Sequence, residues 1–227
     1  MQSTPGSETA VEQKVLEFGI PSFCLTYTRD VSSDELMQRL GASSADAAPL
    51  TLAEADSLVD YESEGTLLRV GMLGNWAFCF ETWGILGAGS YGLSRMSAGT
   101  ETLSYLSGGN GVDLVQNWVN SEPVEIFEPM AIGSLRARDE HPLWDDAQRY
   151  RSEFGDPNLT PIAGISALKA IHDRVGVAIT IELIRHQPLP STWLPESPAM
   201  RLEVPHLLPQ VVRQAPSRGP GRYLGTL

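Results

Sequence analysis

The sequence predicts an α+β fold, in which an antiparallel meander of five to six strands carries short helices on one face and is followed by a C-terminal helical pair. Three observations lead to this prediction. β-rich segments joined by short turns fill the centre of the chain. Helix-capping patterns precede short apolar repeats in the first sixty residues. After Pro129, the apolar residues adopt helical spacing.

Six segments have the composition of strands and are separated by turn residues. Gly74-Asn75 is a two-residue turn between two of them, and Gly108 to Gly111 and Asn120 to Glu122 separate others. Short sequential connections of this kind favour antiparallel neighbours in one sheet. The predicted strands are 23–28, 66–73, 76–82, 101–107, 112–119 and 123–127.

Six segments are predicted to be helical. Ser32 with Glu35, and Thr51 with Glu54, have the spacing of a capping box, in which each side chain bonds the backbone N–H of the other residue. Thr180 is a further N-cap candidate near the end of the helical region. The predicted helices follow Ser32, cover 52–59, 91–98 and 143–154, run from Thr160-Pro161 to Gly176, and follow Thr180.

The chain is predicted to contain one domain. Residues 1–20 are polar at the start and are predicted to be a flexible leader, and residues 21–187 form the single α+β domain. Residues 188–227 contain eight prolines, which are unfavourable in sheet and helix interiors. This C-terminal extension is therefore predicted to be extended or disordered.

The 227 residues have a formal net charge of −12, and this charge is unevenly distributed. Residues 1–135 hold 18 acidic and five basic side chains, whereas the remainder is close to neutral. A negative surface repels phosphate backbones, so nucleic acid is excluded as a general partner. The acidic first part is instead suited to a protein partner with a basic surface.

Compartment and redox state are inferred from features of the whole sequence. The start of the chain has no secretory pattern, and no apolar run is long enough to cross a membrane. Cys24 and Cys79 are expected to be buried free thiols, although a disulfide between them stays open. We therefore predict a cytoplasmic protein without membrane contact.

The segment around Trp76 is the first candidate binding region. Trp76, Phe78 and Phe80 share one face of a predicted strand, and Glu81 and Trp83 follow them. Core packing is the usual role of such a face. The alternative is an aromatic wall that contacts a small ligand, with Glu81 as its polar group.

A run of acidic residues is the second candidate binding region. It comprises Glu54, Asp56, Asp60, Glu62 and Glu64. Calcium is not favoured, because the D-x-D-x-D-G loop pattern is absent and part of the run is predicted to be helical. A solvated acidic face that a basic partner can contact is the preferred interpretation.

No motif in the sequence indicates catalysis, a metal or a cofactor. Gly87 to Gly92 fits G-x-G-x-x-G, but the helix and acidic residue that the dinucleotide motif requires do not follow. The four histidines have no zinc spacing, and there is no G-x-S-x-G elbow. No cofactor, metal site or catalytic residue is therefore predicted, and a non-enzymatic role is favoured.

Three stretches resemble a family of uncharacterised actinobacterial proteins that is known as a domain of unknown function. These stretches are LLRVGMLGNWAFCFETWGILG, LSRMSAGTETLSYL and PVEIFEP, and SALKAIHDRVGVAITIELI is similar to the family's C-terminal helical pair. The resemblance spans about residues 23–186. It implies an α+β fold and no known activity.

Three functions are compatible with these observations. The preferred one is a non-catalytic intracellular interaction module that uses its acidic surface, as an immunity or antitoxin-like protein would. The first alternative is a small-ligand-binding protein or enzyme that uses the aromatic wall around Trp76–Trp83. The second is an accessory or structural subunit that docks through the Pro-rich extension. The oligomeric state stays open.

Overall fold

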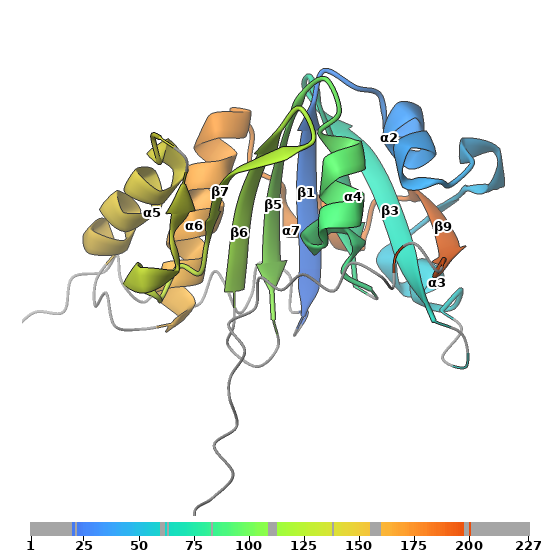
Figure 1. The fold of residues 1–227 in the computed structure, drawn as a ribbon. Helices are drawn as coiled ribbons and strands as arrows, with labels where there is room; N and C mark the ends of the chain where they lie inside the picture. The colour runs from blue at the N-terminus through green and yellow to red at the C-terminus, as the bar shows by residue number, and fades with distance from the viewer. Residues whose placement is uncertain are drawn as a thin grey trace, which may run out of the picture.

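The computed structural model describes residues 20, 22–59, 62, 64–82, 84–108, 113–137, 139–154, 160–197 and 200. Within these ranges, nine strands form one sheet in the order β2-β9-β3-β4-β1-β5-β6-β7-β8 (Figure 1). Every neighbouring pair is antiparallel. The strands are β1 (Phe23–Arg29), β2 (Ala48–Leu50), β3 (Gly65–Leu73), β4 (Trp76–Glu81), β5 (Glu101–Ser107), β6 (Asp113–Val119), β7 (Glu122–Phe127), β8 (Arg136–Ala137) and β9 (Leu189–Pro195).

The α+β class is confirmed, but the sheet is larger than the predicted five to six strands and is not a simple meander. The six predicted strands are β1 and β3 to β7. β5 to β8 follow one another across the sheet, whereas β1 lies between β4 and β5. β1 therefore joins the β3–β4 hairpin to the β5–β8 meander. Six of its seven residues are buried, as expected for a central strand.

β9 lies in the segment that was predicted to be unable to continue the sheet. Pro190 of this strand is opposite Pro49 of β2, and Pro195 is its last residue. Proline is tolerated near edges and at strand ends, where a ladder N–H is not needed. The sheet-forming chain thus reaches residue 195 and does not end at 187. The leader up to residue 19 and residues 201–227 lie outside the described ranges.

Both outer strands of the described sheet are short. β2 has three residues, including Pro49, and β8 has two. Short or proline-containing outer strands limit pairing with another chain.

Helices cover both faces of the sheet (Figure 1). α2 and α4 pack on one face through Leu36, Met37, Leu93 and Met96. The other helices pack on the opposite face through Leu52, Leu143, Leu168 and Ile184. The short helices are therefore divided between the two faces, which corrects the prediction that they share one. The helices are α2 (Ser33–Leu40), α3 (Leu52–Asp56), α4 (Ser90–Met96), α5 (Pro142–Glu153), α6 (Thr160–Val175) and α7 (Ile181–Arg185), with 3₁₀ turns η1 (Ser44–Asp46), η2 (Leu86–Ala88) and η3 (Ile132–Ser134).

Local sequence explains where several elements begin. The Ser32 hydroxyl accepts the N–H of Glu35 at the start of α2, and the capping box between Thr51 and Glu54 opens α3. Gly74, with φ of 60°, makes the turn between β3 and β4. The Thr51–Glu54 box and the Gly74 turn lie where they were predicted. At Ser32 the predicted N-cap is confirmed, but the Glu35 carboxylate accepts from Arg39 and does not complete the box.

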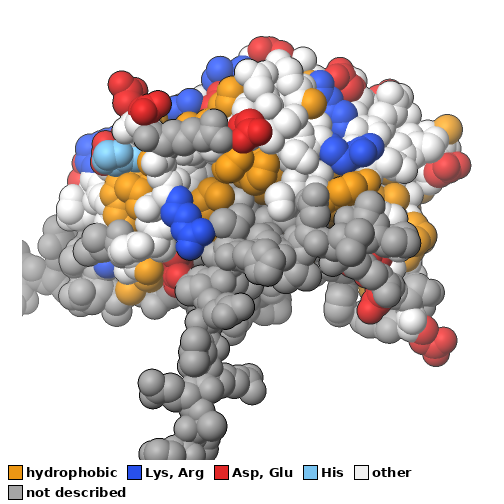
Figure 2. Space-filling model, viewed as in Figure 1, with side chains coloured by type: hydrophobic (Ala, Val, Ile, Leu, Met, Phe, Trp, Pro, Cys, Tyr) orange, Lys and Arg blue, Asp and Glu red, His pale blue; other side chains and the backbone are white. Residues whose placement is uncertain are grey.

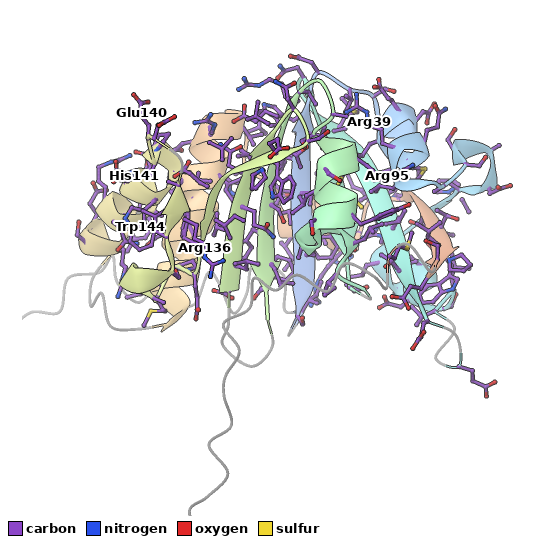
Figure 3. The ribbon with its side chains drawn as sticks, viewed as in Figure 1. Arg39, Arg95, Arg136, Glu140, His141 and Trp144 are labelled. Carbon is purple, nitrogen blue, oxygen red and sulfur yellow. The ribbon has the colours of Figure 1, made fainter. Side chains whose placement is uncertain are left out.

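Two arginines connect α2 with α4 at their C-terminal ends (Figure 3). Arg39 donates to the carbonyl oxygens of Met96 and Ala98, at 2.6 and 2.8 Å. Arg95 donates in return to the carbonyl oxygen of Arg39, at 2.5 Å. Each cation thus lies at the negative end of the other helix, where it is favourable.

Candidate functional site

The aromatic face around Trp76 is part of the protein core. Trp76 is 2% exposed, and Phe78 and Phe80 are fully buried among the side chains of α5, α6 and α7. Phe80 stacks on Phe23 with ring centroids 5.4 Å apart. Side chains in these positions are not accessible to a ligand, so the aromatic wall is corrected to core packing. Trp83 lies outside the described residues.

Glu81 is a buried carboxylate that anchors the following turn. Its two oxygens accept the N–H groups of Leu86 at 2.9 Å and Gly87 at 2.8 Å, at the start of η2. Burial raises the pKa of Glu81 to about 7, although the two amide hydrogen bonds favour the ionised form. At 1% exposure, Glu81 positions the chain and does not offer its carboxylate to solvent.

The turn held by Glu81 lies over a compact polar network between the sheet and α4. Ser104 donates to the carbonyl oxygen of Gly87 at 2.5 Å, and Gln116 donates to that of Ala88 at 2.8 Å. The indole N–H of Trp118 in turn donates to Gln116 at 3.0 Å. Residues 87–89 therefore belong to a packed turn, and residues 90–92 are the first turn of the seven-residue helix α4.

The two cysteines lie on this same face of the sheet. Cys24 is in register with Glu81 and Thr26 with Cys79, so the two thiols occupy adjacent strands. Both are buried and free, which confirms the expected thiols. Burial, with a smaller contribution from the nearby Glu81 carboxylate, raises the pKa of both thiols well above its ordinary value. Thiols in this state are poor nucleophiles.

The acidic run lies at the end of the sheet where β3 begins. Glu54, Glu62 and Glu64 are exposed and Asp56 is half-buried, and we call these four residues the acidic end. Hydrogen bonds from the backbone and side chain of Thr51 lower the pKa of Glu54. Asp56 accepts a hydrogen bond from Thr82 at 3.4 Å, which joins α3 to the end of β4.

Asp60 lies outside the described residues. Among those that are described, no three His, Cys, Asp or Glu side chains are grouped so that they could hold a metal ion. The four carboxylates of the acidic end can make ionic contacts with cationic side chains from outside the molecule.

Arg69 is a buried cation that the sequence reasoning missed. Its side chain is fully buried and donates to the carbonyl oxygens of Ile184 at 2.6 Å and Leu50 at 3.2 Å. Burial lowers the pKa of Arg69 to about 10, while the negative field of Asp56 opposes this shift. The residue fastens α7 and β2 to β3. An Arg among apolar strand residues was the available signal.

Two further polar contacts stabilise the helical layer and were also missed. Glu125 of β7 accepts the N–H groups of Leu143 and Trp144, at 3.3 and 3.1 Å, and so caps α5 from another element. His172 of α6 lies 3.0 Å from the hydroxyl of Tyr27. Burial lowers the pKa of His172 to about 4. Neither pairing has a local sequence signature, because the partners are far apart in the chain.

A sequence profile of the family of unknown function DUF6461 matches residues 13–149, which is more than half of the chain. The chain belongs to this family. The resemblance to an uncharacterised domain family is thereby confirmed. The DUF6461 match begins earlier than the expected residue 23 and ends within α5. It includes β1 to β8, whereas α6, α7 and β9 follow it.

The other comparisons add no relative of known function. No curated protein and no solved structure matches the chain at a significant level. In the part of the chain that the structure describes, no helix combines the length and apolar character needed to cross a membrane.

Proposed function

We propose that this DUF6461 protein is a non-catalytic, cytoplasmic interaction module that binds a basic protein partner through the acidic end. The sharpest form of this proposal is an immunity or antitoxin-like protein that covers a cationic surface of its partner. Complementary charge would steer the encounter and give it specificity.

The exposure of the carboxylates of the acidic end is the observation that carries the proposal. Glu54, Glu62 and Glu64 lie on the surface, and Asp and Glu side chains project at the lower right of Figure 2, where β3 begins in Figure 1. Arg69, which starts from the same strand, directs its guanidinium inward to main-chain carbonyl oxygens. The guanidinium of Arg69 therefore binds groups in the interior and is not part of the surface at the acidic end.

Apolar contact area is available beside these carboxylates. Leu58, between Asp56 and Glu62 in the chain, is 40% exposed, and Ile85 after the end of β4 is 60% exposed. Stable protein interfaces combine a rim of charged groups with some buried apolar area. A basic partner that also presents apolar side chains suits this end of the molecule.

The test is affinity capture with the full chain from cells that naturally make it, at low and high salt. A neutralised variant carries Glu54→Gln, Asp56→Asn, Glu62→Gln and Glu64→Gln. Gln at residue 54 retains the capping box. The matched control removes four carboxylates elsewhere, with Glu140→Gln, Asp145→Asn, Asp146→Asn and Glu153→Gln.

We expect the wild type and the control to capture the same protein at low salt, and the neutralised variant to lose it. High salt should weaken the capture, because exposed charges are screened. Capture that is insensitive to the acidic-end substitutions, or that both variants lose equally, would contradict the proposal. Absence of any partner at low salt would also contradict it.

A further inference from the structure

Two arginines share one carboxylate at the opposite end of the sheet from the acidic end. Arg29 is the last residue of β1, Glu101 is the first residue of β5, and Arg174 lies in the last turn of α6. One oxygen of Glu101 lies 3.1 Å from Nη1 of Arg29. The other accepts from Nε and Nη2 of Arg174, at 2.7 and 2.6 Å. We call Arg29 and Arg174 the arginine pair.

The arginine pair has more charge and more donors than Glu101 can use. Two guanidinium groups against one carboxylate leave one positive charge. Each guanidinium has five N–H donors in a fixed plane. The Glu101 side chain is 8% exposed, whereas those of Arg29 and Arg174 are 40% and 35% exposed. Both arginine side chains therefore reach solvent, whereas the carboxylate that they share is buried.

Both arginines are held in place before any ligand arrives. The guanidinium carbon of Arg29 lies 4.6 Å from the ring centre of Trp76, its register partner on β4. A cation over a buried indole is stabilised by the ring electrons. Arg174 is oriented by two contacts to one oxygen of Glu101. Such pre-organisation reduces the entropy that a ligand would otherwise have to overcome.

Three carboxylates close to the arginine pair in space or in the chain are bound to other groups. Glu125, a second buried carboxylate that Arg174 influences, is fully buried and directs both oxygens to the N-terminal amides of α5. Asp173, adjacent in the chain, contacts Lys169 and Tyr150 on the α5 side of α6. Asp30, which follows Arg29 in the chain and is exposed, accepts the side-chain amide of Asn75 at 2.9 Å. Glu101 is thus shared by both arginines, and the pair retains a surplus of cationic donors.

We propose that the arginine pair binds a carboxylate group, supplied by a small organic acid or by a peptide. A planar carboxylate matches the guanidinium fork and carries the single negative charge that balances the cluster. A phosphate dianion would bring two negative charges against one surplus positive charge, in a molecule whose formal net charge is already −12. This site does not depend on the function proposed for the acidic end.

The test follows the Nε–H signals of the arginines by NMR on the full chain, with acetate added at constant ionic strength. Sodium chloride and inorganic phosphate serve as comparison anions. We expect saturable shifts of the Arg29 and Arg174 signals with acetate, weaker shifts with phosphate and none with chloride. Arg149, which pairs with Asp146 and Glu153, is the internal control.

Tri-alanine and its C-terminal amide distinguish the two sources of the carboxylate. Tighter binding of tri-alanine than of acetate, with loss on amidation, would assign a peptide, and equal binding would assign a small acid. Arg174→Lys retains the charge but not the fork, and should weaken acetate binding about tenfold, while Arg149→Gln leaves it unchanged. Equal shifts with chloride, or preference for phosphate, would overturn the proposal.

Discussion

Glu81 and His172 are buried titratable groups on opposite faces of the sheet, and their effects on stability change in opposite directions as the pH falls. Glu81 is held without a cation against two amide groups, and His172 is held neutral against Tyr27. Burial raises the pKa of Glu81 from 4.5 to about 7 and lowers the pKa of His172 from 6.5 to about 4. Each residue therefore couples folding to protons in its own direction.

We expect the single substitutions Glu81→Gln and His172→Gln to reveal these two contributions. The stability from Glu81 is complete below pH 4.5 and is lost as the pH rises through about 7, because the folded state retains the proton. The stability from His172 is complete above pH 6.5 and is lost as the pH falls through about 4, because the folded state resists protonation.

As the pH falls from 7 to 4.5, the free energy of unfolding of Glu81→Gln should drop by roughly 2–3 kcal/mol relative to that of the wild type. As the pH falls from about 6.5 to 4, the free energy of unfolding of His172→Gln should rise by a similar amount relative to that of the wild type. Urea unfolding of the three proteins at several pH values measures both differences. Wild-type and variant curves that run parallel would show that these groups titrate normally.

The glycines of segment 87–92 provide a second test at the residue scale. A Cβ at Gly87 would lie 2.5 Å from Thr26 Cγ2 and 2.6 Å from Glu81 Oε1. At Gly89 the nearest atoms would be at 3.7 Å. Gly87→Ala should therefore cost about 1–3 kcal/mol in the free energy of unfolding.

Gly89→Ala is the matched control for that substitution. Gly89 is the N-cap residue of α4, and alanine is less favourable there. Alanine also lowers the entropy of the unfolded chain, which stabilises the folded state. The two effects oppose each other, so the free energy of unfolding should change by less than about 1 kcal/mol. Thermal or urea unfolding compares the two variants. Equal stability of both would mean that the approach of Gly87 to Thr26 is not a constraint.

At the scale of elements, β9 joins β3 to the outer strand β2. Ser191 to Pro195 pair with β3, and the ring of Trp193 covers Gly65. A chain that ends at Gln187 loses this strand and exposes the backbone donors and acceptors of β3. A chain that ends at Met200 retains β9 and serves as the control.

We expect the chain ending at Met200 to unfold cooperatively and to be markedly more stable than the chain ending at Gln187. Circular dichroism during urea unfolding measures the difference, since loss of paired strand backbone removes many hydrogen bonds together. Indistinguishable unfolding of the two chains would contradict the structural role of β9.

The elements that sequence reasoning found are those with local signals. Ser32, Thr51 and Gly74 act within a few residues of themselves, so the helices and the hairpin they begin could be predicted. The position of β1 between β4 and β5 depends on packing across the whole chain and has no local signature. β9 was not predicted because its prolines are unfavourable in a sheet interior, and the sequence does not show that Pro190 pairs with the outer strand β2 or that Pro195 ends the strand.

The candidate sites also differ in whether local sequence could reveal them. The acidic residues are visible in the sequence, and their exposure is consistent with the polar pattern around them. Glu101 joins Arg29 to Arg174, two residues that are 145 positions apart, and this meeting requires the sheet and α6 to be in place. The inward orientation of Glu81 likewise depends on the turn that follows it.

At the scale of the whole molecule, the two proposed sites lie at opposite ends of the strands. The acidic end lies where β3 begins, and the arginine pair lies where β1 ends and β4 begins. The nine residues of β3 separate these ends by roughly 30 Å, at about 3.3 Å per residue. The two proposed sites can therefore be occupied at the same time.

The short outer strands have a consequence for how the molecule meets others. Within the described sheet, the outer strands offer three residues at one side and two at the other, which leaves little main chain for a visiting peptide to extend. Edge-to-edge pairing of sheets from many copies, which would build a fibre, is hindered for the same reason. Selectivity toward a partner then depends on the chemical identity of surface groups, so exchanging those groups should redirect binding without altering the scaffold.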